Sequence, residues 1–115
     1  MDMYGIPNCD TVKKSRIWLT QHNLAYEFHD FKKTGVSVAQ LSNWAEQVGW
    51  EKLLNRSGTT WRRLPEEIKI SITTPAAAFA LMAVQTSIIK RPLLAYKDHL
   101  LVGFNEAEYA ALLIN

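Results

Sequence analysis

The sequence contains one thiol, placed where it could act as a nucleophile. Cys9 is the only cysteine in 115 residues, and it directly follows Pro7-Asn8, a residue pair typical of turns. No proline or glycine interrupts the chain from Asp10 to about His22, so we expect a helix that begins next to the cysteine. Unpaired N–H groups and the helix dipole at such a position favour the thiolate, which is the nucleophilic form.

The charged residues that follow Cys9 have opposite effects on the stability of a thiolate. Lys13 and Lys14 add positive potential, whereas Asp10 opposes it. The N–H groups at the helix start could also hold an anion. The alternative is a structural thiol, because a free cysteine is among the most buried residue types and often serves as a small core hydrophobe. The preceding turn favours an exposed and reactive position.

The elements on either side of Cys9 must hold it in place. Met3 to Ile6 is a short apolar run that predicts a strand before the turn. Ala25 to Phe31 alternates between Tyr26 and Phe28 on one face and charged or polar residues on the other, which predicts a half-buried strand. Two strands around one helix indicate a right-handed βαβ unit.

The other end of the chain also predicts strands and a helix. Leu93 to Tyr96 and His99 to Val102 flank Lys97-Asp98, a pattern typical of a hairpin. Asn105 then begins a last helix that carries Tyr109 on its apolar face. Pro92 stands just before the first hairpin strand, where a proline is tolerated and where a cis bond occurs.

The middle of the chain is predicted to be helical. Ser37 and Gln40 have the spacing of a capping box, and apolar residues follow at helical intervals up to Gly49. Pro65 and Pro75 stand at positions suited to the first turn of two further helices. We predict no strand between residues 32 and 90.

The order β-α-β, helical insertion, β-β-α defines an α/β fold class with a thioredoxin-like core. We predict one domain over residues 1–115, with the core in 1–31 and 90–115 and the helical insertion in 32–89. This length is enough to bury a single core.

Composition limits the classes of function. Hydrophobic residues make up 48% and charged residues 21%, and the net charge is +2 without a block of like charges, so we expect no direct binding of nucleic acid or membrane. The first residues lack the pattern of a secretory signal, and one cysteine cannot form an internal disulfide. We therefore expect a reducing, cytoplasmic location.

Other residues that could carry chemistry give weaker signals. His22, His29 and His99 share no metal-ligand spacing along the chain, so we predict no metal site and no bound cofactor. Glu27 and Asp30 could form a carboxylate pair, but nothing in the sequence places them in a cleft.

Several motifs together resemble the glutaredoxin-linked arsenate reductases (ArsC) and their Spx-type relatives, and most closely the YffB-like branch. The stretch from Tyr4 to Lys14 resembles the active-site loop of that family. Leu54 to Leu64 is similar to its segment with an anion-binding arginine, and Arg91 to Leu94 is similar to its Arg-Pro motif. Val102 to Glu106 resembles the ending found in the Spx-like and YffB-like branches.

This resemblance implies a reductase with Cys9 as the catalytic nucleophile and Arg56 and Arg91 beside it. Their guanidinium groups would favour the thiolate and bind an oxyanion or a glutathione carboxylate. Substrate or glutathione binding would also involve the loop residues and the Arg-Pro proline, namely Asn8, Asp10, Thr11 and Pro92. Glutathione is the expected co-substrate, with glutathione or glutaredoxin as the partner and a small thiol or oxyanion as the substrate.

Two departures from the family pattern leave alternatives open. Gly103 stands where arsenate reductases place a third arginine, which argues against arsenate as the natural substrate. Val12 stands where Spx-type regulators often place a second cysteine, so any disulfide must form with another molecule. The leading hypothesis is a glutathione-dependent thiol–disulfide reductase. The alternatives are an Spx-like binding protein that contacts RNA polymerase, and a weak arsenate reductase.

Overall fold

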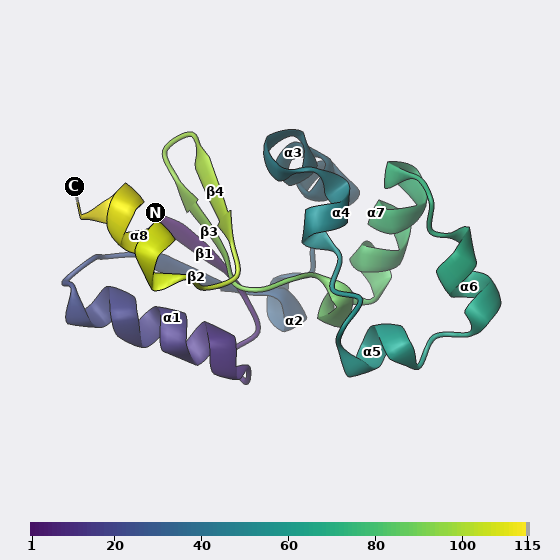
Figure 1. Cartoon of the computed structure of the whole chain (residues 1–115), viewed down its shortest axis with the longest axis horizontal. Helices are drawn as coiled ribbons and strands as arrows, with labels where there is room; N and C mark the ends of the chain where they lie inside the picture. Colours follow the sequence, from purple (N-terminus) through teal and green to yellow (C-terminus); the bar gives the residue numbers. More distant parts are fainter. Residues whose placement is uncertain (115) are drawn as a thin grey trace. The chain divides into compact units, whose positions relative to one another are not determined.

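A computed structural model describes residues 1–114 and divides the chain into two compact units. One unit comprises residues 1–34 and 91–115 of the chain, and the other comprises residues 35–90. The sequence analysis placed the corresponding boundaries at residues 31/32 and 89/90. Figure 1 shows the sheet in the first unit and a purely helical second unit.

The first unit is built on a four-stranded sheet with the order β2-β1-β3-β4 (Figure 1). β1 (Asp2–Gly5) pairs in parallel with β2 (Glu27–Asp30) and antiparallel with β3 (Leu93–Tyr96). β4 (His99–Val102) pairs with β3 as the hairpin that the sequence predicts. Lys97 has a φ of 54° in the tight turn between these two strands.

Two helices cover one face of this sheet. α1 (Asp10–Gln21) forms the parallel crossover between β1 and β2, and α8 (Glu106–Leu113) follows the hairpin. Met3 and Leu94 from the sheet pack against the buried residues of both helices. These helical residues are Val12, Trp18, Leu19 and Tyr109. The side chain of Asn105 accepts a hydrogen bond from the N–H of Glu108, which caps α8 as predicted. A short helix, α2 (Phe31–Thr34), directly follows β2.

The second unit is helical, as the sequence predicts. Its two longest helices are α3 (Val38–Val48) and α7 (Pro75–Val84), which pack against each other. Ser37 caps α3 by accepting from the N–H of Gln40, and Thr74 caps α7 in the same way. The remaining elements are short: α4 (Trp50–Leu53), α5 (Thr59–Arg62), α6 (Glu66–Ser71) and the 3₁₀ turn η1 (Thr86–Ile88).

Trp61 is buried, with 9% of its surface accessible. The short helices of the second unit differ from the sequence-based expectation. Helices α4 and α5 were not predicted, because four residues are too few to show a helical period. Within residues 1–114, every helix is too short or too polar to cross a lipid bilayer.

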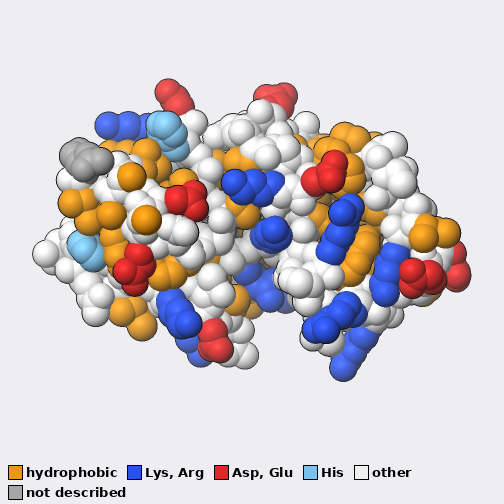
Figure 2. Space-filling view, viewed as in Figure 1, with side chains coloured by type: hydrophobic (Ala, Val, Ile, Leu, Met, Phe, Trp, Pro, Cys, Tyr) orange, Lys and Arg blue, Asp and Glu red, His pale blue; other side chains and the backbone are white. Residues whose placement is uncertain are grey.

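The face of the molecule in Figure 2 carries hydrophobic, basic and acidic side chains side by side. Some large apolar side chains in the described part of the chain are exposed, among them Ile17, Ile70 and Val84. Exposed apolar side chains are normal on a folded protein surface.

Candidate active site

Cys9 is the N-cap residue of α1. Its backbone is extended, with φ −145° and ψ 126°, and its carbonyl oxygen accepts the N–H of Lys13 at 2.9 Å, which starts the helix. The side chain makes no capping hydrogen bond to the helix N–H groups. The thiol is therefore not used to cap the helix, and it lies at the helix end where the dipole places partial positive charge.

The burial of Cys9 combines features of both sequence-based interpretations. The residue is half-buried and packs against the core cluster that contains Met3 and Val12. It is thus neither fully enclosed, as a structural cysteine would be, nor fully exposed. A nucleophilic cysteine needs this kind of partial access, because a sulfur atom of the substrate disulfide must come into contact with the thiolate that attacks it.

The loop residues predicted to assist Cys9 lie on the solvent side. Asn8, Asp10 and Thr11 are exposed, and Asp10 is an acidic residue in the first turn of α1. Their positions are compatible with contacts to a bound peptide thiol. Their roles in binding stay predictions.

The Arg-Pro motif lies in the same unit as Cys9. The Arg91–Pro92 peptide bond is cis, as the sequence analysis expected, and Pro92 is buried. Arg91 is half-buried, and its Nε atom is enclosed by protein. The carbonyl of Pro92 accepts the N–H of Gly103 at 2.8 Å, which ties this loop to the end of β4.

Gly5 brings the cysteine loop and the Arg-Pro motif together. A Cβ atom at this position would lie 3.1 Å from Cγ2 of Val12, 3.7 Å from Cβ of Arg91 and 3.8 Å from Cα of Pro92. Val12 belongs to the first turn of α1, so Arg91, Pro92 and the start of the helix that follows Cys9 all border the same glycine. Only a residue without a side chain fits this junction without displacing its neighbours.

Arg56, the other predicted arginine, lies in the helical unit. It is exposed, and its Cζ atom is 5.6 Å from the centroid of the Trp61 ring, within cation–π range. Asn55 bridges the turn around Arg56, since its Oδ1 accepts hydrogen bonds from the N–H and the hydroxyl of Ser57. The arrangement orients Arg56, but its role at Cys9 stays a prediction from the sequence.

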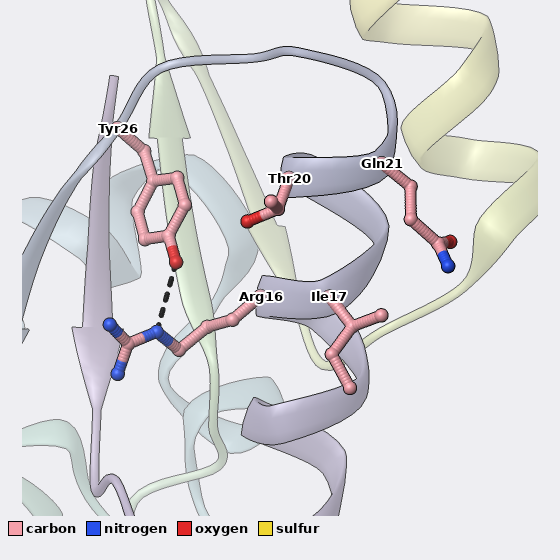
Figure 3. A pocket seen from close by; sticks show the side chains of 5 residues that line it. All are labelled: Arg16, Ile17, Thr20, Gln21 and Tyr26. Carbon is pink, nitrogen blue, oxygen red and sulfur yellow. Dashed lines mark hydrogen bonds between the residues drawn. The ribbon is translucent and has the colours of Figure 1, made fainter.

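A hollow of about 310 Å³ lies on α1 but is lined by none of the predicted site residues. Figure 3 shows its five lining side chains: Arg16, Ile17, Thr20, Gln21 and Tyr26. Arg16 extends away from the helix so that its Nε donates to the Tyr26 hydroxyl at 2.9 Å, drawn as a dashed line (Figure 3). Its guanidinium also lies over the Phe28 ring, with Cζ 4.2 Å from the centroid. Arg16 is thus engaged in packing against Tyr26 and Phe28.

Tyr109 supports the loop that carries Pro92, a contact that the sequence did not predict. The Tyr109 hydroxyl donates to the carbonyl of Gly103 at 3.1 Å, and the N–H of that glycine holds Pro92. The hydroxyl also bonds Ser15 at 2.9 Å. Burial raises the pKa of Tyr109 to about 12, partly offset by the Ser15 hydrogen bond. The sequence showed Tyr109 only as an apolar position of the last helix, so no spacing rule could have found this link.

Comparisons with known proteins agree with this architecture. A model of the ArsC family matches residues 4–112. The solved structure of the YffB protein has a TM-score of 0.91 at 46% identity, covering 96% of both chains. An arsenate reductase (ArsC) related protein from Brucella melitensis has a TM-score of 0.76 at 48% identity, covering 96% of this chain and 91% of that one. The predicted α/β fold class with a thioredoxin-like core is confirmed by these neighbours.

A regulator is also among the relatives. The global transcriptional regulator Spx of Streptococcus agalactiae is 26% identical over 110 residues, covering 93% of this chain and 78% of the regulator. The proteins similar to this chain thus include both a protein related to arsenate reductases and a transcriptional regulator.

Proposed function

This chain belongs to the ArsC family, and from that premise we propose that it is a glutathione-dependent thiol–disulfide reductase with Cys9 as the nucleophile. The observation that carries the proposal is the position of Cys9 at the N-cap of α1, half-buried and with a side chain that makes no capping bond. The N–H groups at this helix end would stabilise the thiolate and the developing charge on sulfur. The second support is the Arg91–Pro92 loop, which borders the same glycine as the first turn of α1.

The reaction consists of two thiol–disulfide exchanges. In the first, the Cys9 thiolate attacks the glutathione sulfur of a mixed disulfide, forms a Cys9–glutathione disulfide and releases the substrate as a thiolate. In the second, the thiolate of a free glutathione attacks that adduct, releases reduced Cys9 and forms oxidised glutathione. The net change is reduction of the substrate's mixed disulfide by one free glutathione, which leaves in oxidised glutathione together with the glutathione that the substrate carried. Because the chain has one cysteine, the second thiol must come from another molecule.

Charged residues at the site would give specificity for glutathione by binding its carboxylates. Arg91 is the cation that the resemblance places at the sulfur, and a guanidinium binds a carboxylate by two parallel hydrogen bonds. The resemblance assigns Arg56 to the same task. The exposed loop residues Asn8 and Thr11 would donate hydrogen bonds to the peptide groups of glutathione.

The test measures both half-reactions in the wild type and in Cys9→Ser. The protein is incubated with oxidised glutathione, and the adduct is mapped by mass spectrometry. Turnover is then followed with a glutathionylated peptide, glutathione, and glutathione reductase with NADPH. We expect an adduct at Cys9 and turnover in the wild type, both lost in Cys9→Ser. Absence of the adduct and of turnover, while a glutaredoxin works in the same assay, would refute the proposal.

The second candidate function is binding to RNA polymerase, favoured by the likeness to the Spx regulator of Streptococcus agalactiae. The discriminating experiment captures purified RNA polymerase on immobilised wild type and Cys9→Ser. Capture that is equal in both would favour the regulatory function, since a reductase has no need of that contact. A residual arsenate reductase activity is tested by arsenite production with glutathione and glutaredoxin present. Gly103 in place of an arginine predicts little or none.

A further inference from the structure

Three potential metal ligands from two neighbouring strands meet on one face of the sheet. In the parallel register, Asp2 pairs with Glu27 and Tyr4 pairs with His29. Side chains two residues apart on a strand point to the same face, so these four side chains share a face. The opposite face carries Met3 and the core packed under α1. One ligand atom each from Asp2, Glu27 and His29 lies within 4.8 Å of the other two.

We propose that Asp2, Glu27 and His29 bind one divalent transition-metal ion, with Zn²⁺ as the reference ion. Imidazole nitrogen and carboxylate oxygen are both zinc ligands in proteins, and a zinc site with three protein ligands keeps water in its fourth position. Ligand atoms around a tetrahedral zinc ion with bonds of 2.0–2.1 Å lie about 3.4 Å apart. The present separations therefore need only small side-chain rotations to close around an ion.

Two of the three ligands are already oriented toward a common point. Nε2 of His29 lies 2.9 Å from Oδ1 of Asp2, so an ion could replace the proton that now links these atoms. The Tyr4 ring stacks on the imidazole, with centroids 4.6 Å apart and planes at 17°, which fixes the ring plane. A metal-binding histidine needs such support, because a fixed ring loses less freedom when the ion binds.

The site is accessible from solvent. The side chains of His29 and Asp2 are 28% and 43% exposed, and Glu27 is exposed. An open hollow of about 500 Å³ is lined in part by Asp2 and Glu27, which leaves room for a water ligand on the ion. The sequence analysis expected no metal site because the histidines lack ligand spacing. The parallel register supplies a proximity that spacing along one strand cannot show.

The alternative interpretation is a hydrogen-bonded Asp2–His29 pair with no affinity for metal. The test titrates Zn²⁺ into tag-free protein carrying Cys9→Ser, so that the thiol cannot bind the ion, and follows the heat of binding. Co²⁺ serves as a second probe, because its visible absorption reports nitrogen and oxygen coordination. We expect one site with a Kd in the micromolar range, and at least tenfold weaker binding in Asp2→Asn and in His29→Gln.

The matched control is His99→Gln, which removes an exposed histidine from another strand of the same unit and should leave the affinity unchanged. Glu27→Gln provides a ligand variant at an exposed position, where loss of folding is not expected. A rise in the melting temperature with Zn²⁺ in the parent, absent in the ligand variants, gives a second readout. No binding up to 1 mM Zn²⁺, or binding unchanged by all three ligand substitutions, would overturn the proposal.

Discussion

The hydroxyl groups of Ser15 and Tyr109 lie 2.9 Å apart in the core, although 94 residues separate them along the chain. The proton of the Tyr109 hydroxyl goes to the carbonyl of Gly103, so Ser15 must donate the bond between the two hydroxyls. Ser15 has no exposed surface, and Tyr109 is 1% exposed. This chain of bonds links α1, α8 and the end of β4, which also holds the Arg91–Pro92 loop.

We predict that Ser15→Ala and Tyr109→Phe each lower the free energy of unfolding by about 1–2 kcal/mol, because each removes the buried hydrogen bond between the two hydroxyl groups. The double substitution should cost less than the sum of the two, since it removes both partners at once. Urea denaturation of the four proteins measures this difference. Strict additivity would mean that the bond does not form in solution.

The raised pKa of Tyr109 predicts a loss of stability at alkaline pH. The pKa is about 12 in the folded protein against 10 for an ordinary tyrosine, mainly because burial disfavours the phenolate. Between these values the unfolded chain releases the proton while the folded protein keeps it. The contribution of Tyr109 to the free energy of unfolding is therefore constant below pH 10. It falls by about 1.4 kcal/mol per pH unit between pH 10 and about 12, roughly 2–3 kcal/mol in all.

Unfolding free energies of the wild type and Tyr109→Phe between pH 9 and 12 test this prediction. The difference between the two proteins should shrink and then reverse as the pH rises, because the variant lacks the titrating group. Tyr96→Phe is the control for loss of a tyrosine hydroxyl outside the core, since Tyr96 is only half-buried. If the unfolding free energies of the wild type and Tyr109→Phe changed with pH in the same way, the raised pKa of Tyr109 would be contradicted.

Gly5→Ala is predicted to destabilise the junction between the cysteine loop and the Arg-Pro motif by about 1–3 kcal/mol. The added methyl group would lie 3.1 Å from Cγ2 of Val12, which is fully buried and cannot move aside freely. Adding Val12→Ala should offset part of this loss, even though Val12→Ala alone destabilises the core. Thermal denaturation of the two single variants and the double variant measures the coupling. If Gly5→Ala were as stable as the wild type, the junction would be packed less tightly than these distances indicate.

Gly103→Ala is predicted to cost about 1–2 kcal/mol for a conformational reason alone. Gly103 has a φ of +79°, and nothing lies within 4 Å of the position a Cβ would occupy. Gly103→Asn should cost less, because asparagine tolerates positive φ better than alanine. The ranking of melting temperatures, with glycine above asparagine and asparagine above alanine, checks the prediction. A lower value for asparagine than for alanine would point to steric crowding instead.

Local patterns in the sequence were sufficient for much of the first unit. The α1 helix, the hairpin around Lys97 and the cap at Asn105 each depend on residues close in the chain, and all three are confirmed. The position of Cys9 at the start of α1 followed from the same local signals. The Ser15–Tyr109 bond did not, because it depends on how two distant helices pack. The cluster around His29 likewise depends on strand register, which the sequence leaves open.

The alkylation rate of Cys9 tests whether Arg91 acts on the thiol. The Cβ of Arg91 borders Gly5 together with the first turn of α1, and the family resemblance places its guanidinium at the sulfur, so we expect its positive charge to speed the reaction of Cys9. We expect Arg91→Ala to react with iodoacetamide about fivefold more slowly than wild type at pH 7, and Arg91→Lys to lose less, because lysine keeps the charge. The alkylation rate in Arg56→Ala tests whether the arginine in the helical unit also acts on Cys9.

Arg16→Ala is the matched control for this measurement, since Arg16 packs on Tyr26 and Phe28 and should leave the rate unchanged. Equal slowing in Arg16→Ala and Arg91→Ala would indicate a general effect of net charge, not a specific contact with the thiolate. Slowing in Arg91→Ala alone would assign the activation to the Arg-Pro motif. Slowing in Arg56→Ala as well would mean that the helical unit contributes a charge to the same reaction, as the family resemblance implies.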